Sequence, residues 1–288
     1  MELQQLRYIC SIAELKSFSR AAEQCHVAQP SLSQQVQKLE EELGTRLFDR
    51  LGRTVRLTDA GQAFLPHARS ILHQLEAARA SVTSQSTDLG GGVAVGAIPT
   101  IAPYLLPHPT AQFGSKYPKA KLRIVEETTP VLIEQLKNLS LDFAILALPL
   151  RHKELETIRL RVEPLYAVLP KNHPAAKLKT LTLRQLSNED FVMLRDGHCF
   201  RDLSLAACSR AKLRPRISFE SDQFRSLLGM VAAGIGVSLI PEMAVDRGQK
   251  CAYVRLSDPQ ARRTIVVAQL RGRSLNSAQK AFLAELRQ

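Results

Sequence analysis

Two of the five cysteines in this chain of 288 residues, Cys199 and Cys208, lie nine positions apart. A cysteine reacts as its thiolate, and a nearby cation or a helix N-terminus increases the thiolate fraction. Cys199 directly follows His198 and lies two positions before Arg201, and both of these side chains can carry positive charge. These neighbours favour the thiolate form of Cys199, and a second thiol lies close along the chain, so a redox-active pair is one interpretation.

The segment that joins the two cysteines reads as a helix over residues 199–210, with Cys199 near the N-terminal donors. The neighbours that predict burial of Cys208 are apolar: Leu203, Leu205, Ala206 and Ala207. A helix rises about 1.5 Å per residue, so the two α-carbons would lie about 13 Å apart. Since a disulfide tolerates about 4.4–6.8 Å between α-carbons, the thiols can bridge only if the helix unfolds. A disulfide here would act as a switch, although the spacing alone leaves open that both cysteines are unreactive core residues.

The remaining cysteines, at positions 10, 25 and 251, complete no CxxC pair and no zinc-ligand spacing, so we predict no metal site and no cofactor. The net charge is +12, which favours a polyanionic partner because each neutralised phosphate releases a condensed counterion. The hydrophobic content of 45% is ordinary, and the length allows more than one domain. We find no secretory signal pattern and no membrane-length apolar run, and therefore expect a cytoplasmic protein without a membrane partner.

Three helices are predicted near the N-terminus: one over residues 3–14, a short one capped by Ser19, and one from Pro30 that ends at Gly44. A short helix, a tight turn and an amphipathic helix form the helix-turn-helix layout, whose second helix enters the DNA major groove. With the apolar stripe of the third helix turned inward, these residues become candidates for DNA contact: Gln29, Pro30, Ser31, Ser33, Gln34 and Lys38.

Alternating apolar residues around Gly52 predict a β-hairpin wing that carries Arg50, Arg53 and Arg56 toward the DNA backbone. Any single Gln or Arg could equally be a solvated surface residue. The complete arrangement is more specific, and it predicts a winged helix-turn-helix domain with double-stranded DNA as its partner.

Thr58 is expected to cap a long helix that follows the wing. The apolar residues of this helix recur at steps of three and four, as in a coiled-coil seam: Leu65, Ala68, Leu72, Leu75 and Val82. An isolated helix cannot bury such a seam, so we expect a partner helix and hence a homodimer. Polar residues followed by three glycines at 90–92 then read as a hinge.

From residue 93 onward, short apolar strands alternate with helices, which predicts an α/β domain with a largely parallel core. The segments 165–169 and 264–268 read as strands that cross between two lobes. Ligands in such sheets gather where strands end and helices begin, and Thr100 and Thr129 both lie at such ends. Helix capping is the alternative role for each threonine.

Several segments resemble the LysR-type transcriptional regulators. In the N-terminal part they are FSRAAE at 18–23, QPSLS at 29–33, LG at 43–44, LFDR at 47–50 and LTDAG at 57–61. Further along, GHCFRD at 197–202 followed by Cys208 is similar to the sensing segment of the peroxide-responsive members of that family, and IPT at 98–100, YLLP at 104–107 and RRTI at 262–265 also match. The resemblance covers nearly the whole chain.

This resemblance implies a winged helix-turn-helix domain over residues 1–58, a dimerising linker helix and hinge over 59–87, and a regulatory domain over 88–288. The regulatory domain would have the two-lobed α/β fold of periplasmic binding proteins. Lobe I would span about 93–162 and 268–288, and lobe II about 163–267.

The same resemblance implies a regulator that activates oxidative-stress genes when hydrogen peroxide oxidises Cys199 and a disulfide forms with Cys208. The residues implied around or near the peroxide are Thr100, Thr129, His198, Arg201, Asp202 and Arg263. Implied partners are promoter DNA, RNA polymerase and further copies of the chain, as a homodimer that pairs into a homotetramer. Phe200 is a departure, because a leucine is expected after the first cysteine.

Two alternatives compete with this hypothesis. A LysR-type regulator could respond to a small organic effector in the cleft between the lobes, with both cysteines inert. A peroxidase-like enzyme would leave the helix-turn-helix and coiled-coil parts without a purpose, so we predict that the chain is not an enzyme. Peroxide-dependent loss of free thiol, and turnover with a thiol reductant, would separate the three.

Overall fold

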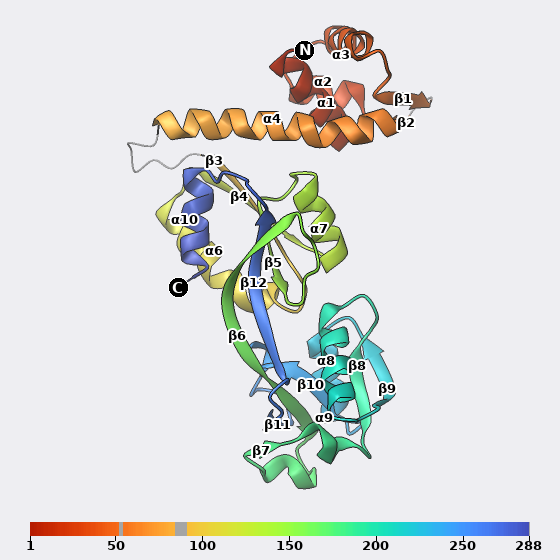
Figure 1. Cartoon of the computed structure of the whole chain (residues 1–288), viewed down its shortest axis with the longest axis vertical. Coiled ribbons are helices and arrows are strands. Elements are labelled where there is room, and N and C mark those ends of the chain that lie inside the picture. The colour runs from red at the N-terminus through yellow and green to blue at the C-terminus, as the bar shows by residue number, and fades with distance from the viewer. Residues whose placement is uncertain (52–53, 84–90, 288) are drawn as a thin grey trace.

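The computed structural model describes residues 1–51, 54–83 and 91–287. Figure 1 shows three parts along its longest axis: an N-terminal domain with the long helix α4, a first lobe beneath it, and a second lobe at the far end. This order matches the predicted succession of a DNA reader, a linker helix and a two-lobed α/β domain.

The N-terminal domain consists of three helices and a hairpin: α1 (Leu3–Leu15), α2 (Phe18–Gln24), α3 (Gln29–Leu43), β1 (Phe48–Leu51) and β2 (Thr54–Leu57). Gly44 ends α3 with a φ of 68°, as its position predicted. The predicted cap of the second helix was wrong. The Ser17 hydroxyl, not that of Ser19, accepts the capping hydrogen bond, from the Arg20 N–H, because the buried Phe18 already belongs to the helix.

Helix α4 (Asp59–Thr83) begins where predicted, since the Thr58 hydroxyl accepts a hydrogen bond of 3.0 Å from the Gly61 N–H. The burial of the predicted seam residues differs between the two ends of α4. Leu65 and Ala68 are buried within the chain itself, where α4 packs against α1, so they need no partner helix. Leu72 and Leu75 are half-buried, and the side chain of Val82 lies outside the described residues.

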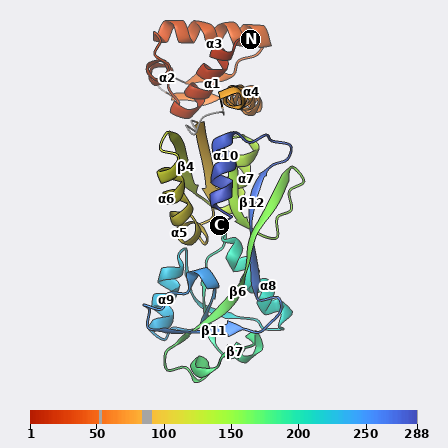
Figure 2. The ribbon, with the colours of Figure 1, turned by 90° about the vertical axis from the view of Figure 1, so that its left-hand side faces the viewer.

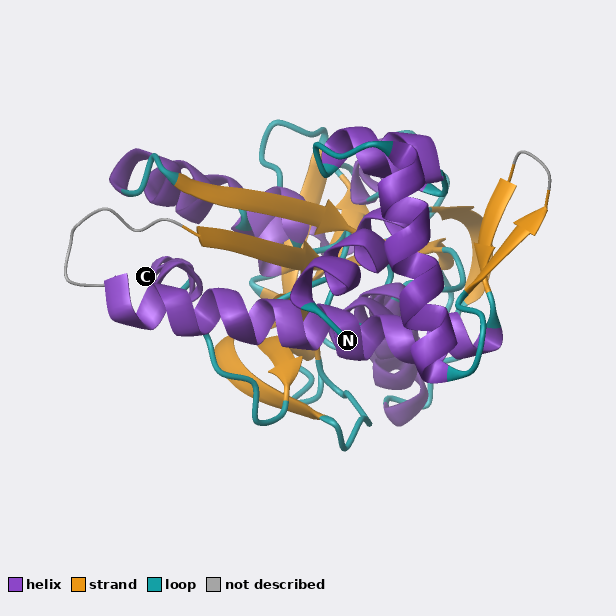
Figure 3. Cartoon of the chain, turned by 90° about the horizontal axis from the view of Figure 1, so that it is seen from above, coloured by secondary structure: helices purple, strands orange, loops and turns teal. Residues whose placement is uncertain are grey.

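Most of the predicted hinge, residues 84–90, lies outside the described residues. Its last two residues, Gly91 and Gly92, belong to a strand instead. They form the first positions of strand β3 (Gly91–Ala97). The wing projects at one edge of the molecule, away from the C-terminal end of α4 (Figure 3).

One continuous sheet runs through both lobes, in the order β4 (Ala120–Glu126), β3, β5 (Phe143–Ala147), β12 (Arg262–Leu270), β6 (Leu155–Pro170), β11 (Cys251–Leu256) and β7 (Thr180–Leu181), with β10 (Ser238–Pro241) also on β6. Strand β3 is parallel to β4 and β5, whereas β12 is antiparallel to both of its neighbours. The sheet is therefore more mixed than the parallel core we predicted, and its short strands β7 and β11 were missed.

Helices flank each lobe (Figure 2). Those of lobe I are α5 (Ala102–Leu105), α6 (Pro107–Lys116), α7 (Thr129–Lys137) and α10 (Ser277–Glu285). Lobe II contains α8 (Cys199–Arg210) and α9 (Phe224–Ala232), the parallel strands β8 (Asp190–Leu194) and β9 (Arg216–Ser221), and the 3-10 helices η1 (Pro174–Lys177), η2 (Leu183–Leu186) and η3 (Glu242–Ala244).

The long strands β6 and β12 cross between the lobes as predicted, and each lobe has its own hydrophobic core. The second crossing lies earlier than the predicted limit at residue 267. Ile265, Val266 and Val267 pack in the core of lobe I, because they pair with β5 there. The connection between the lobes therefore lies near Glu163 and Arg263, which face each other across the two strands.

Candidate functional site

Helix α3 presents a polar face at its N-terminal half. Leu32, Val36 and Leu39 are buried, while the predicted DNA contacts Gln29, Pro30, Ser31, Gln34 and Lys38 are exposed and Ser33 is half-buried. This is the arrangement that a recognition helix requires. The side chains of Arg50 and Arg53 lie outside the described residues.

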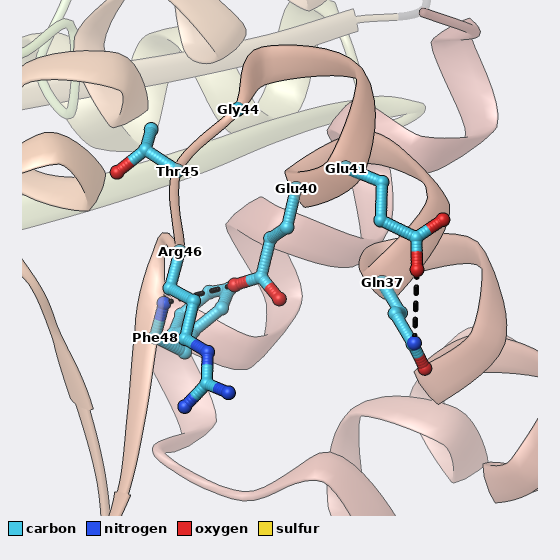
Figure 4. A pocket seen from close by; sticks show the side chains of 7 residues that line it. All are labelled: Gln37, Glu40, Glu41, Gly44, Thr45, Arg46 and Phe48. Atoms are coloured by element: carbon cyan, nitrogen blue, oxygen red, sulfur yellow. Dashed lines mark hydrogen bonds between the residues drawn. The ribbon is translucent and has the colours of Figure 1, made fainter.

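A carboxylate that we did not predict ties the wing to this helix. Glu40 Oε1 accepts hydrogen bonds from the Leu47 N–H (2.7 Å) and the Phe48 N–H (3.1 Å) at the start of β1. Glu40 lines an open pocket of about 610 Å³. Figure 4 shows it beside Gln37, which donates to Glu41. Glu40 therefore joins α3 directly to the start of the wing.

Cys199 lies at the first turn of α8, after the left-handed Gly197 (φ 94°) and the N-cap residue His198. Although α8 belongs to lobe II, Cys199 packs against the core of lobe I. A pocket of about 10 Å³ lies at this junction, lined by Ile98, Pro99, Thr100, Thr128, Thr129, Gly197, His198 and Cys199. Such a volume has room for about one molecule of the size of water.

The groups around the Cys199 thiol shift its pKa in opposite directions. Burial raises its pKa above the ordinary 9.0, and this is the largest effect. A hydrogen bond with Thr129 and the positive charge of Arg263 act in the opposite direction, while the Asp202 carboxylate raises the pKa further. The resting thiol is therefore protonated near neutral pH, whereas the sequence had pointed mainly to features that favour thiolate.

Two threonines from different segments of the chain lie beside Cys199 or Arg263. Thr100 is 3% exposed, and its hydroxyl oxygen accepts a hydrogen bond of 3.1 Å from Arg263. The Thr129 hydroxyl is buried and lies against the thiol, and no nitrogen or oxygen of the described residues hydrogen bonds with it. Thr129 thus leaves hydrogen-bonding capacity free toward the pocket.

The predicted cations near Cys199 have different neighbours from those expected. The Arg201 guanidinium binds Asp196 (2.7 Å), Glu220 and the Leu194 carbonyl, so it braces the loop before α8 rather than the thiol. His198 Nε2 lies 3.3 Å from Asp222 Oδ1. The cation that acts on the thiol is Arg263, which comes from a strand 64 positions later and is fully buried.

Cys208 lies in the core of lobe II with no exposed surface, and burial raises its pKa to about 11. Both cysteines are free thiols, and α8 is continuous from Cys199 to Arg210. Their α-carbons therefore lie about 13 Å apart along the helix, too far for a disulfide without unfolding of α8.

Comparison with known proteins agrees with this architecture. The family model of the bacterial regulatory helix-turn-helix protein, lysR family, matches residues 3–62, and that of the LysR substrate binding domain matches residues 86–288. The chain belongs to the LysR family of transcriptional regulators.

Individual relatives of this LysR regulator match over nearly their full length. A hydrogen peroxide-inducible genes activator of Escherichia coli O157:H7 is 34% identical over 290 residues, covering 100% of this chain and 95% of the relative. The transcriptional dual regulator GltC of Bacillus subtilis is 33% identical over 285 residues, covering 98% and 95%. The structure of a full-length OxyR variant from Pseudomonas aeruginosa superimposes with a TM-score of 0.85 at 34% identity, covering 100% and 95%.

These LysR relatives are transcriptional regulators and not enzymes, in agreement with the sequence prediction. The two curated relatives match almost equally well, so identity alone does not select the signal that this LysR protein senses. Among the described residues, no helix is long and apolar enough to cross a bilayer, and no group of His, Cys, Asp or Glu could hold a metal ion.

Proposed function

We propose that this LysR regulator senses hydrogen peroxide through Cys199 and is switched by a disulfide between Cys199 and Cys208. The observation that carries the proposal is the pocket of about 10 Å³, which joins a thiol, the Thr129 hydroxyl and the His198 backbone turn. The pocket is too small for an organic effector, and hydrogen peroxide, with only two heavy atoms, is close to the water-sized molecule for which it has room. The similarity to a peroxide-inducible activator supports the same choice.

The reaction has two steps. The Cys199 thiolate attacks one oxygen of hydrogen peroxide, the O–O bond breaks, and the leaving hydroxide takes up a proton, which gives sulfenic acid and water. Thr100, Thr129 and His198 supply polar groups around the two oxygens, and Arg263 favours the thiolate. After α8 unfolds, the Cys208 thiol attacks the Cys199 sulfur, the S–O bond breaks, and a second water leaves as the disulfide forms. Arg201 and Asp202 support the segment, Arg201 by bracing the loop before α8.

We further infer that two chains pair through the C-terminal part of α4, where Leu72 and Leu75 are half-buried and Ile71 is exposed. A dimer matches two half-sites on promoter DNA, and two dimers would form a homotetramer that activates transcription with RNA polymerase in the cytoplasm.

The residues that would contact the major groove are Gln29, Pro30, Ser31, Ser33, Gln34 and Lys38. Arg50 and Arg53 would contact the DNA backbone. We expect Gln34→Ala to relax discrimination at one base position, without the weaker salt dependence expected for Lys38→Ala. Binding assays on base-substituted operators at several salt concentrations measure both.

Mass spectrometry of peptides after one equivalent of hydrogen peroxide tests the peroxide assignment. We expect a peptide linked through Cys199 and Cys208, and sulfenic acid at Cys199 in Cys208→Ser. Cys251→Ser is the matched control, because Cys251 is, like Cys208, a buried thiol in the core of lobe II, and this variant should still form the linked peptide. Unmodified Cys199 in the parent protein would refute the assignment.

A further inference from the structure

A fully buried ion pair connects the two crossing strands beside the pocket. Glu163 of β6 faces Arg263 of β12, and neither side chain is exposed. Arg263 Nε lies 2.7 Å and Nη2 lies 2.6 Å from Glu163 Oε1. The second carboxylate oxygen accepts a hydrogen bond of 3.0 Å from the Met243 N–H of η3. Glu163 is thus held on both oxygens, and it was not among the predicted site residues.

The other side of the guanidinium faces the peroxide pocket. Arg263 Nη1 donates to the Thr100 hydroxyl (3.1 Å), and both Nη atoms lie 3.3 Å from the Thr100 carbonyl oxygen. Arg263 Cζ lies 5.4 Å from the ring centroid of Phe200, the residue next to Cys199. The guanidinium is therefore held by Glu163 on one side and by Thr100, which lines the Cys199 pocket, on the other.

A buried guanidinium is stabilised by whichever anion is nearest, and two anions in this cluster share one cation. Burial lowers the pKa of Arg263, and Glu163 opposes that effect more strongly than Cys199 does. Asp202 of α8 also acts on Cys199, and Tyr104 of α5 acts on Arg263. His198 lies directly before the thiol. Among these groups, Glu163 is the carboxylate bonded to the cation.

We propose that Glu163 is a positioning residue for the Cys199 reaction: it fixes the Arg263 guanidinium and neutralises its charge, and so limits how strongly Arg263 stabilises the thiolate. This inference rests on the proposed function. Its consequence is that a smaller fraction of Cys199 is ionised at a given pH than the charge of Arg263 alone would cause. Phe200 and Thr100 contact the guanidinium from its other side and hold it in a fixed orientation.

The test is the pH dependence of Cys199 alkylation in the full-length chain, followed by peptide mass spectrometry in the parent and in Glu163→Gln. Glutamine keeps the shape and removes the charge, so Arg263 becomes free to pair with thiolate. We expect the alkylation midpoint to fall by about one pH unit or more. The rate with hydrogen peroxide at neutral pH should rise roughly three- to fourfold, because tenfold more thiolate is offset by its lower intrinsic nucleophilicity.

Asp142→Asn is the matched control. Asp142 forms another buried carboxylate–guanidinium pair, with Arg273 in lobe I, and their side chains are 7% and 5% exposed. Its loss should destabilise the fold comparably while leaving the Cys199 midpoint in place. A purely structural role for Glu163 would make the two variants behave alike.

An unchanged or raised midpoint in folded Glu163→Gln would overturn the inference. If that variant does not fold, Glu163→Asp decides instead, since it withdraws the carboxylate by one methylene and should lower the midpoint by a smaller amount. An unchanged midpoint in folded Glu163→Asp would overturn the inference as well. Failure of the peroxide proposal looks different, because Cys199 would then form no sulfenic acid in any variant, whatever its alkylation midpoint.

Discussion

At the scale of single residues, one side chain near Cys199 offers a hydrogen bond to a ligand, and a different one acts on the pKa of the thiol. The Thr129 hydroxyl lies against the Cys199 thiol and is free of other polar partners among the described residues, so it can bond first to thiolate and then to peroxide. Arg263 supplies positive charge. Its guanidinium is hydrogen bonded to Thr100 and paired with the carboxylate of Glu163, which reduces its effect on the thiol. Each side chain therefore has one task, and each can be removed separately.

Thr129→Val should lower the second-order rate of Cys199 oxidation by about tenfold. Valine keeps the shape but removes a hydrogen bond to a charged group, which is worth roughly 1.5–3 kcal/mol. Stopped-flow kinetics with hydrogen peroxide measures the rate. Thr110→Val is the control, because the Thr110 hydroxyl of α6 is also buried without a described partner but lies outside the pocket. Equal rates in Thr129→Val and the parent would remove Thr129 from the site.

The Cys208 thiol predicts a specific loss of stability at alkaline pH. Its pKa is about 11 in the fold and 9.0 without burial, so the folded state binds the proton more tightly. The stability that this gives is fully present below 9.0 and is lost as the pH rises through about 11. Thermal unfolding of the reduced protein across this range should show a steeper alkaline decline in the parent than in Cys208→Ala. Identical pH profiles would contradict the burial of this thiol.

At the scale of elements, α8 contains a buried hydroxyl that would favour the unfolding required by the proposed disulfide. Ser204 lies between the two cysteines, is 1% exposed, and its hydroxyl has no hydrogen-bond partner among the described residues. An unsatisfied buried hydroxyl costs about 1–3 kcal/mol. A disulfide that closes a ring of ten residues restricts the unfolded segment by roughly 3 kcal/mol. Removing the unsatisfied hydroxyl from the core would therefore offset much of the entropy lost in closing the ring. This favours unfolding of α8 when the disulfide forms.

Ser204→Ala should therefore stabilise the reduced protein by about 1 kcal/mol and slow disulfide formation, while sulfenic acid at Cys199 forms at the parent rate. Denaturant unfolding gives the first quantity, and quenched-flow mass spectrometry separates the two steps. Ser209→Ala is the control on the same helix, since Ser209 is exposed and should change neither quantity. A less stable Ser204→Ala would show that the hydroxyl is satisfied after all.

How far the sequence predicts these elements depends on whether the cause is local. The bounds of α8 could be predicted, because Gly197, His198 and the apolar spacing lie within one segment. The braces of Arg201 and the pairing of Arg263 with Glu163 could not, because their partners come from other strands. Likewise the α4 seam has the correct period, but only the fold shows that α1 buries Leu65 and Ala68.

At the scale of the whole molecule, the pocket and the DNA reader are connected through lobe I. Thr129 lies at the first position of α7, and Asn138 and Ser140 follow the other end of that helix. Arg69 of α4 donates a hydrogen bond of 3.0 Å to the Ser140 hydroxyl, which is itself bonded to Asn138. One end of α7 thus lies against the Cys199 thiol, and the segment after its other end is hydrogen bonded to the linker helix α4.

We expect oxidation to shift α7 when Cys199 leaves the pocket, and so to change the spacing of the paired DNA readers. DNase footprints and solution scattering of reduced and oxidised protein should differ in the parent. In Arg69→Gln the disulfide should form normally, but the difference between the two footprints should shrink, because α4 no longer follows the Ser140 loop. Lys137→Gln is the control, since Lys137 ends α7 but pairs with Glu134 and Glu154 rather than with α4. Identical footprints for reduced and oxidised parent, with the disulfide proven present, would exclude this route from thiol to DNA.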